Sequence, residues 1–573
     1  MRAPAIRGSG HVDRTGHGEY SGSPVQRFGL AERRGSLERA ADSIADVLVV
    51  GGGITGAGVA REAALRGLSV VLLDKGDFAS GTSSRSSKLI HGGVRYLEQG
   101  DVALVREAAR ERAVIRGLAP HLARPVRMML PARSRRGRMK LSAGLWTFEK
   151  LAGQDGIDEG YDVFDRDRCV AAEPGLRADH LAGAVMFTEY VTSDARLTLE
   201  TVKSAHAAGA LAASYASVEA ITHEGAGVRA DVHDLLGGGG LVVRARCLVN
   251  AAGPWFDRVR GLSEPGSSPV VQLTRGIHLV VPHERLPVRH VVVLRAPDGR
   301  STFVVPRAGY SYIGTTDTLY EGDAEEPGVT AADARYLLES VAATFTDAPV
   351  AADVCGTWSG VRPLLREDGK KPSEISRRDE IRTGPGPVVS IAGGKLTTFR
   401  RMAERVVSEV VSILGGSGDG ADQSLRRPLA GGGAVEQQQA RAAAPRLADS
   451  TLEDRLWSTY GVAAGPIVQR IARDGAAGEA VGGIDCITAA EVGHCVAHEM
   501  VTSLDDLLRR RSHIAMFDTR RALAAARDVA LHMAVEMGWD ERRVAAEVDA
   551  FTRDRRGELA AANGGHPTDH EDD

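Results

Sequence analysis

Three glycines and one carboxylate carry the clearest chemical signal in this sequence. Gly51, Gly53 and Gly56 form a G-x-G-x-x-G run, and Asp74 follows 23 positions after Gly51. In this pattern the first glycine permits a tight turn, the second lets the backbone approach a pyrophosphate, and the third allows close helix packing. An acid about 20 residues further on accepts a hydrogen bond from a ribose hydroxyl and disfavours a 2′-phosphate. The pattern predicts a dinucleotide site for NAD or FAD rather than NADP.

The pattern works only if a strand, a helix and a second strand hold these residues in place. Residues 46–50 and 69–73 are apolar and rich in β-branched side chains, which is typical of buried parallel strands. The segment between them predicts a helix with a small-residue face, made by Ala57, Ala60, Ala63 and Ala64. Because all the parts stand in register, a chance match among 67 glycines is a poor explanation.

A polar segment follows the second strand. Residues 79–88 carry many hydroxyl groups and two cations, which suits the polar side of a bound flavin and its phosphates. On composition alone, a solvated serine-rich loop is the better explanation. The Gly92-Gly93 pair favours the flavin because it lets the backbone pass close to a flat group.

The run from Gly81 to Glu98, which ends S-K-L-I-H-G-G-V-R-Y-L-E, resembles the FAD-dependent glycerol-3-phosphate dehydrogenases, a branch of the glycine/D-amino-acid oxidase-like flavoproteins. Further matching motifs lie at residues 119–122, 130–131, 194–197, 250–255, 274–278, 313–317, 360–364, 376–377 and 393–400. The resemblance spans roughly residues 45 to 540. The sequence departs from the family at Pro306-Arg307, where many members carry Pro-Trp.

The resemblance implies FAD as the cofactor, and because no cysteine or histidine is placed to favour a covalent link, we expect the FAD to bind non-covalently. Strand-like alternation at residues 277–281, 290–294, 301–305 and 310–314 predicts a mixed or antiparallel sheet, and helical periodicity from residue 452 onwards predicts a small all-α domain. We expect an α/β FAD-binding Rossmann-like domain, a mixed or antiparallel β-sheet substrate domain and a small C-terminal all-α domain. The expected cofactor-binding residues are Gly51, Gly53, Gly56, Asp74, Thr82, Ser83, Ser87, Lys88, His91, Gly92, Gly93, Val218, Ala252, Gly253, Gly394, Lys395 and Leu396.

A 2-hydroxy phosphate substrate needs cations for its phosphate and a base for its hydroxyl proton. Four cations stand near glycine or proline turns, where arginine forks suit a phosphate pocket better than solvent. His278 is the candidate base, since neutral imidazole near pH 7 suits proton abstraction, although an apolar strand also suits a core histidine. We expect the catalytic residues His278, Arg362 and Lys395, and the substrate-binding residues Arg95, Tyr96, Arg377 and Thr397.

The resemblance implies oxidation of sn-glycerol 3-phosphate to dihydroxyacetone phosphate, with electrons passed to a membrane quinone. An oxidase that uses O2 is the alternative, because these motifs do not report O2 access. A non-catalytic flavin-binding protein is disfavoured, because it needs no phosphate cations. The expected location is the cytoplasm, with peripheral attachment to the inner face of the cytoplasmic membrane and a possible homodimer.

Composition restricts these interpretations further. The 573 residues carry 43% hydrophobic and 25% charged residues, which is ordinary for a globular enzyme, and a net charge of −4 gives no reason to expect nucleic acid. No apolar run reaches the roughly 18 residues of a membrane span. The cysteines form no C-x-x-C pair, which argues against a zinc site and for buried thiols in a reducing compartment.

Changes in residue pattern predict the domain limits. We expect a disordered extension at 1–44 with a short helix near Leu30 to Ala41, and a disordered acidic tail at 561–573. The oxidoreductase unit is expected at 45–425, with FAD-binding parts at about 45–130, 185–258 and 385–415 and a substrate-binding part at about 259–384. A glycine- and glutamine-rich linker at 426–446 and a helical domain at 447–560 complete the chain. Residues 509–511, three arginines, predict a solvated helix end or, less simply, contact with anionic lipid.

Overall fold

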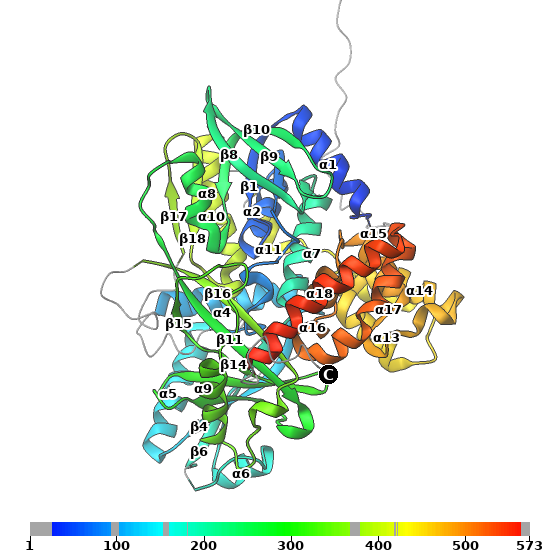
Figure 1. The fold of residues 1–573 in the computed structure, drawn as a ribbon. Coiled ribbons are helices and arrows are strands. Elements are labelled where there is room, and N and C mark those ends of the chain that lie inside the picture. The colour runs from blue at the N-terminus through cyan, green and yellow to red at the C-terminus, as the bar shows by residue number, and fades with distance from the viewer. Residues whose placement is uncertain are drawn as a thin grey trace, which may run out of the picture.

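The computed structural model describes residues 26–92, 102–152, 160–179, 181–366, 379–416, 420 and 422–562. In Figure 1 these residues form two β-sheet domains and a group of C-terminal helices that packs beside them. The expected fold class is confirmed in each of its three parts.

A mostly parallel sheet organises the first domain. Its strands are β1 (Ile44–Val50), β2 (Val70–Leu73), β7 (Leu211–Ala213), β8 (Ala216–Glu224), β9 (Gly227–Asp234), β10 (Gly240–Asn250), β17 (Glu380–Thr383) and β18 (Val388–Ala392). Among the described residues their order is β17-β18-β10-β1-β2-β7, with the β8–β9 hairpin joined to β10. The neighbours of β1 run parallel to it, and the strands expected at 46–50 and 69–73 are confirmed as β1 and β2.

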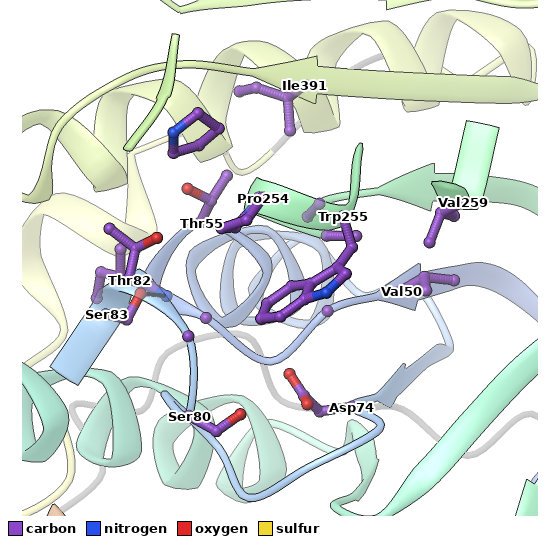
Figure 2. Close-up of a pocket in the computed structure, with 18 of the residues that line it drawn as sticks. Val50, Thr55, Asp74, Ser80, Thr82, Ser83, Pro254, Trp255, Val259 and Ile391 are labelled. Atoms are coloured by element: carbon purple, nitrogen blue, oxygen red, sulfur yellow. Dashed lines mark hydrogen bonds between the residues drawn. The ribbon is translucent and has the colours of Figure 1, made fainter. Parts of the chain in front are cut away.

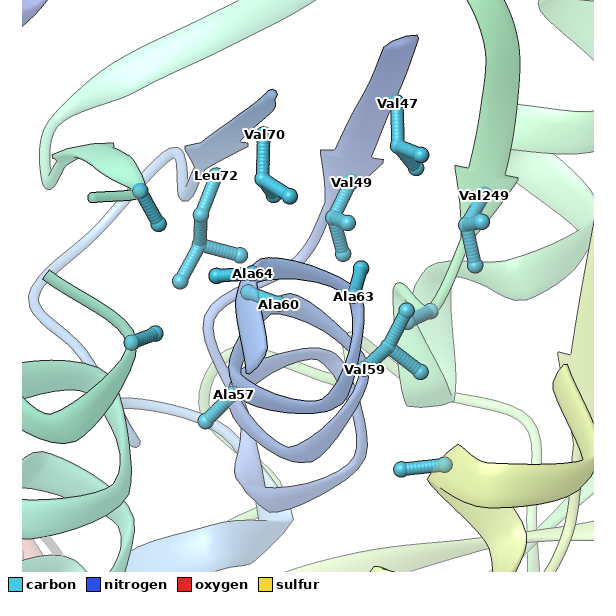
Figure 3. Close-up of a cluster of buried hydrophobic side chains, with 14 of the residues drawn as sticks. Val47, Val49, Ala57, Val59, Ala60, Ala63, Ala64, Val70, Leu72 and Val249 are labelled. Carbon is cyan, nitrogen blue, oxygen red and sulfur yellow. The ribbon is translucent and has the colours of Figure 1, made fainter. Parts of the chain in front are cut away.

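The helix α2 (Ile54–Leu65) joins β1 to β2 and covers the centre of this sheet. Figure 3 shows its alanines facing the valines and the leucine of β1, β2 and β10. The small-residue face is buried as expected, since Ala57, Ala60 and Ala63 are 0% exposed. The helices α7 (Asp194–Ala207) and α10 (Phe399–Ile413) pack on either side of α2 and complete this core.

The second domain is built on a mixed sheet. Its strands are β3 (Leu89–Ile90), β4 (Arg124–Ala132), β5 (Asp162–Phe164), β6 (Gly183–Val191), β11 (Val271–Pro282), β12 (Val291–Arg295), β13 (Ser301–Arg307), β14 (Tyr310–Gly314), β15 (Thr318–Tyr320) and β16 (Gly356–Leu365). The predicted strands after residue 270 are confirmed. The sheet is not confined to 259–384, because β12 pairs in parallel with β4 and thereby takes in the β4–β6 pair from earlier in the chain.

Helices cover both sheet domains. They are α1 (Leu30–Asp42), α4 (Val102–Leu118), α5 (Arg135–Ala152), α6 (Arg166–Ala172), α8 (Phe256–Ser263) and α9 (Ala331–Ala342). The helix expected near Leu30 to Ala41 is confirmed as α1, but the prediction that this part of the extension is disordered is wrong. Arg33 on α1 donates to the Ser214 carbonyl at 2.7 Å and pairs with Asp234, which fixes α1 to the first domain.

The C-terminal domain is helical along most of its length. Its helices are α11 (Gln423–Arg426), α12 (Ala434–Ala443), α13 (Ser450–Tyr460), α14 (Ala464–Arg473), α15 (Ala489–His498), a π-helix (Asp506–Arg511), α16 (Ile514–Phe517), α17 (Thr519–Met537) and α18 (Glu541–Ala562). The glutamine-rich part of the predicted linker forms α12, in keeping with the helix propensity of glutamine. A short hairpin, β19 (Ala480–Val481) and β20 (Ile484–Thr488), departs from the all-α expectation, because Gly482 and Gly483 both take positive φ.

The three arginines of the π-helix are buried, so the prediction of a solvated or lipid-facing helix end is wrong. Arg509, Arg510 and Arg511 are 4%, 4% and 6% exposed. Arg510 and Arg511 both donate to Asp77, at 2.6 and 2.7 Å, in the loop that follows β2. The π-helix end therefore docks on the first domain through ion pairs removed from water.

Within the described ranges, no helix combines the length and hydropathy needed to cross a membrane. In the same ranges, no group of three acidic, histidine or cysteine residues could hold a metal ion. All five cysteines have free thiols, and the burial expected for most of them is confirmed for Cys169, Cys247, Cys355 and Cys495, whereas Cys486 is half-buried.

Candidate active site

The glycine turn between β1 and α2 has the geometry that its sequence predicts. Gly51 takes φ +109°, a conformation that favours glycine, and it lines a long pocket in the first domain. A Cβ atom on Gly56 would lie 1.8 Å from the Gly51 carbonyl oxygen, so only glycine lets α2 approach the turn this closely. Gly53 also lines the pocket, and a Cβ placed there would meet only the Ser83 side chain.

Asp74 lies at the end of β2 and holds the glycine turn. Its two carboxylate oxygens accept hydrogen bonds from the backbone N–H groups of Gly52 at 2.6 Å and Gly76 at 2.8 Å. Burial raises the pKa of Asp74 to about 6, although both backbone N–H groups act in the opposite direction. The Asp74 side chain also lines the pocket. The expected ribose hydroxyl would donate one more hydrogen bond to a carboxylate that already accepts from the turn.

The other walls of the pocket come from distant parts of the chain. Val218 on β8 and the turn after β10, with Ala252 and Gly253, line it as expected. Figure 2 shows the indole of Trp255 near its centre, between Asp74 and Pro254. The Lys75 ammonium group lies 4.0 Å from the centre of the Trp255 ring. Trp255 lies in the motif at residues 250–255, but the motif alone assigns it no role.

The serine-rich loop closes the pocket from the side of α2. Thr82 and Ser83 line it; Thr82 Oγ1 donates to the Val361 carbonyl at 2.7 Å, and Ser83 Oγ accepts from the Ile54 N–H at 2.9 Å. Ser83 therefore satisfies one of the free N–H groups at the start of α2, where the phosphate was expected.

Lys88 does not lie where the cofactor prediction placed it. Its side chain is 0% exposed, and its Nζ donates to Asp194 Oδ1 and to the Ser84 carbonyl, each at 2.8 Å. Lys88 is not among the pocket-lining residues, whereas Asp194 is. The other carboxylate oxygen of Asp194 accepts from the Ser86 hydroxyl at 2.7 Å. A buried lysine thus neutralises an aspartate that shapes the loop, a pairing that only the tertiary structure reveals.

His278 lies on β11 in an aromatic environment under the same loop. Its ring stacks on Trp358 with 4.5 Å between centroids and an interplanar angle of 12°. Its Nε2 lies 2.9 Å from Ser87 Oγ, and no described residue offers its buried Nδ1 a hydrogen-bond partner. Burial, and after it the charges of Arg362 and Lys88, hold the pKa of His278 well below its usual value, so the imidazole is neutral at pH 7.

Arg362 lies on the same sheet face as His278. On the antiparallel pair of β11 and β16, Thr274 faces Arg362, Gly276 faces Gly360 and His278 faces Trp358. A Cβ on Gly276 would lie 2.6 Å from Arg362 Nη1, so the missing side chain leaves room for the guanidinium to reach back towards His278. Arg362 Nη2 donates to Thr315 Oγ1 at 3.0 Å, and its Nη1 contacts the Thr316 carbonyl.

The loop before α10 brings three further candidates to the pocket. Gly394, Lys395 and Leu396 line it. Gly394 takes φ +95°, and a Cβ there would meet Met402, so this position needs glycine. Thr397 is buried and donates to the His91 carbonyl at 3.2 Å, which joins this loop to the segment after β3.

The structure describes some of the remaining expected site residues and not others. The N–H of Gly92 donates to the Glu189 carboxylate at 3.1 Å, and neither it nor Ser87 and His91 lines the pocket. Gly93, Arg95, Tyr96 and Arg377 lie outside the described residues.

Family comparisons agree with this geometry. The sequence model of FAD dependent oxidoreductases matches residues 46–398, and that of the C-terminal domain of alpha-glycerophosphate oxidase matches residues 423–544. The second match begins at residue 423 and so includes residues 426–446, the segment that the sequence predicts as a linker.

Similar proteins extend over most of the chain. The aerobic glycerol-3-phosphate dehydrogenase of Bacillus subtilis is 40% identical over 413 residues, 71% of this chain and 74% of the relative. The solved glycerol-3-phosphate dehydrogenase from Bacillus halodurans, complexed with FAD, is 31% identical with a TM-score of 0.76 and covers 95% of this chain and 100% of its own. The L-alpha-glycerophosphate oxidase from Mycoplasma pneumoniae, at 17% identity and a TM-score of 0.52 over 65% of this chain and 96% of its own, shares the fold.

The fold and the pocket define a flavin-dependent oxidoreductase. More narrowly, the chain belongs to the family of FAD-dependent glycerol-3-phosphate dehydrogenases, and FAD is its cofactor. The residues present fit that cofactor: the glycine turn admits no Cβ at Gly51 and Gly56, a carboxylate lies at the end of β2, and the pocket continues to Lys395.

Proposed function

We propose that this chain oxidises sn-glycerol 3-phosphate to dihydroxyacetone phosphate and passes the electrons to a membrane quinone. The observation that carries the proposal is the shared face of β11 and β16, on which the Arg362 guanidinium reaches over Gly276 towards a neutral, buried His278. Pro363, the neighbour of Arg362 on β16, and Ser86, the neighbour of Ser87, line the pocket, so the strand and the loop that carry Arg362 and Ser87 both border it.

His278 takes the proton of the substrate's C2 hydroxyl at Nε2, the ring nitrogen that faces the serine-rich loop. The lowered pKa keeps the imidazole neutral at neutral pH, and in the tautomer that carries its proton on Nδ1 the Nε2 atom can accept. Ser87 Oγ at 2.9 Å from Nε2 holds the ring in orientation. FAD, when bound, accepts the hydride that leaves C2. Stacking on Trp358 excludes water from one face of the base.

Arg362 and Lys395 stabilise the negative charge that develops on the C2 oxygen. Thr315 and Thr316 hold the Arg362 guanidinium, so its orientation is fixed before the substrate binds. We assign Thr397 and the undescribed Arg95, Tyr96 and Arg377 to binding the substrate, with the two arginines on the phosphate, where bidentate forks are strongest.

Quinone reduction requires contact with a membrane, and we propose that α5 provides it on the inner face of the cytoplasmic membrane. Met139 and Trp146 on this helix are 70% and 54% exposed, and their seven-residue spacing puts them on one face. The nearby side chains of Arg135, Arg136 and Lys140 are exposed as well. An exposed apolar face flanked by cations suits an interfacial helix on anionic lipid.

Turnover by the FAD-loaded protein tests the proposal. Anaerobic flavin reduction by sn-glycerol 3-phosphate measures the first half-reaction, and reoxidation by a short-chain quinone or by O2 measures the second. We expect reduction by sn-glycerol 3-phosphate, none by glycerol, and faster reoxidation by the quinone. Faster reoxidation by O2 would favour the oxidase, the second candidate, which the match to the alpha-glycerophosphate oxidase C-terminal domain supports. A flavin that sn-glycerol 3-phosphate never reduces would contradict both.

Vesicle flotation tests the membrane contact. We expect the protein to float with vesicles that contain anionic lipid and to be partly released by high salt. Trp146→Glu should weaken this association, whereas Leu319→Glu, at a 53% exposed apolar residue on β15, should not. Equal binding of the two variants would place the membrane contact elsewhere.

A further inference from the structure

A second polar cavity lies apart from the active site, where the second sheet, α7 and the C-terminal domain meet. Its free volume is about 110 Å³, several times the roughly 30 Å³ that one water molecule takes up in the liquid. Four arginines and two histidines line it, and no described acidic residue does: Arg124, Arg196, Arg307, Arg511, His121 and His513.

Two of these arginines have carboxylate partners behind the cavity wall. Arg196 pairs with Glu499 on the C-terminal domain, and Arg511 donates to Asp77 at 2.7 and 2.9 Å. Both guanidinium charges are therefore balanced within the protein.

The other two arginines lack such a balance among the described residues. Arg307 donates to the Thr192 carbonyl at 2.7 Å, and no carboxylate of a described residue lies within ion-pair distance of Arg307 or Arg124. Arg124 and Arg307 line the same cavity, and burial together with the Arg307 charge lowers the pKa of Arg124. Arg307 is half-buried and Arg124 is exposed, so solvent screens their repulsion only in part, and an anion held between them would relieve the rest.

His121 adds a donor that no described residue uses. Gln437 Nε2 donates to the Gly431 carbonyl at 2.7 Å, so this atom is the amide nitrogen, and it lies 3.1 Å from His121 Nδ1. The neutral His121 ring must then accept at Nδ1 and carry its proton on Nε2, which is buried without a partner in the described structure. His121 is 7% exposed and Arg196 is 2% exposed, and Arg196 Nη2 is likewise unpartnered there.

We infer that this cavity binds a small phosphate-type oxyanion: free inorganic phosphate or a small phosphomonoester. A dianion balances the charges of Arg124 and Arg307, and its oxygens accept from Arg196 Nη2 and His121 Nε2–H. Arg124 is exposed at the mouth, which leaves the site open to solvent. The inference does not depend on the proposed catalytic function.

The test uses the FAD-loaded protein with inorganic phosphate as the probe, by calorimetric titration and by thermal unfolding, at constant ionic strength against chloride. We expect saturable binding that raises the unfolding temperature. Arg307→Gln and Arg124→Gln should each weaken binding roughly ten-fold or more, because each removes a charge-assisted contact. The matched control Arg426→Gln, at an arginine side chain that is 82% exposed, should bind like the wild type.

A background variant separates this cavity from the active site. In Arg362→Ala protein the phosphate response should persist, and adding Arg124→Gln should remove it. Repeating the titration with sn-glycerol 3-phosphate in that background tells whether the cavity also binds phosphomonoesters. Binding of phosphate alone identifies free inorganic phosphate as the ligand, and binding of both compounds shows that phosphomonoesters are ligands as well. Arg124→Gln keeps the test valid if Arg307→Gln fails to fold. No phosphate binding, or binding that Arg362→Ala abolishes and Arg124→Gln leaves intact, would overturn the inference.

Discussion

His278 Nε2 lies 2.9 Å from the hydroxyl of Ser87, which ties the candidate base on β11 to the loop that closes the cofactor pocket. The ring stacks on Trp358, whose indole Nε1 in turn donates to the Ser86 carbonyl at 3.1 Å. The base and the pocket wall are thus one connected unit, so a change in either should affect proton transfer.

Replacing the base tests its role. His278→Asn should slow anaerobic flavin reduction by sn-glycerol 3-phosphate by roughly 10²–10⁴-fold, the usual contribution of general base catalysis, with flavin content unchanged. Ser87→Ala should slow it less, because it loses only the orienting contact. Stopped-flow bleaching of the flavin measures both. Wild-type bleaching in His278→Asn would show that another group takes the proton.

Replacing Arg362 tests the charge beside the base. Arg362→Ala should lower kcat/KM for sn-glycerol 3-phosphate by roughly ten- to a few-hundred-fold, because a hydrogen bond to a charged group contributes on the order of 1.5–3 kcal/mol. The control Arg366→Ala, at an exposed arginine just beyond β16, should leave kcat/KM unchanged.

The same variant should also change the pH profile of flavin reduction. Burial lowers the pKa of His278 and the Arg362 charge lowers it further, so the wild-type rate should not fall as the pH decreases through 6.5. Without Arg362 the pKa of His278 rises, and the acid limb should move towards neutral pH. An unshifted limb would mean that the two groups do not interact.

Asp74 should make FAD binding depend on pH. Burial raises its pKa to about 6, so the carboxylate that accepts from Gly52, and that we expect to accept from the ribose, gains a proton as the pH falls through that value. We expect the FAD dissociation constant to rise below about pH 6. Asp74→Asn should bind FAD more weakly and without this pH dependence, as measured by flavin fluorescence after dilution.

The buried ion pairs of Asp77 should dominate domain docking. Asp77→Asn leaves Arg510 and Arg511 short of a partner in a buried environment, and breaking such a pair typically costs about 3–5 kcal/mol of unfolding free energy. Denaturant unfolding should show this loss, whereas Asp485→Asn, at an aspartate side chain that is 82% exposed, should change little. Equal stability of the two variants would contradict the docking role.

Acid should destabilise the protein through its buried histidines. Burial lowers the pKa of His121 and of His494 to about 3, so between that value and about 6.5 the unfolded chain binds protons that the folded chain does not. Folding stability from these groups is complete above about pH 6.5 and decreases as the pH falls below it. The carboxyl groups of Asp74, Glu111, Glu189, Glu200 and Glu547, whose pKa values burial raises, act in the opposite sense. Burial also lowers the pKa values of His206, His278 and His513, which add to the loss in acid. Calorimetry should find a lower unfolding temperature at pH 5.5 than at pH 7.5.

The sequence by itself determined the nucleotide-binding unit, its glycine turn, the strands of the second sheet after residue 270 and the C-terminal helices. These features depend on local periodicity and on turn residues, and both signals lie within the segment that forms the element. For the same reason Gly51, Gly56 and Asp74 lie where their spacing predicts.

Only the tertiary structure decided what the distant charges do. Lys88 is directed to Asp194 rather than to the cofactor, and Arg510 and Arg511 are buried against Asp77 rather than solvated. The position of a cation in the sequence does not tell which distant carboxylate will form an ion pair with it when both are buried. That pairing, like the joining of β4 to β12, exists only once the separate elements pack together, because desolvation and register are properties of the assembled contacts.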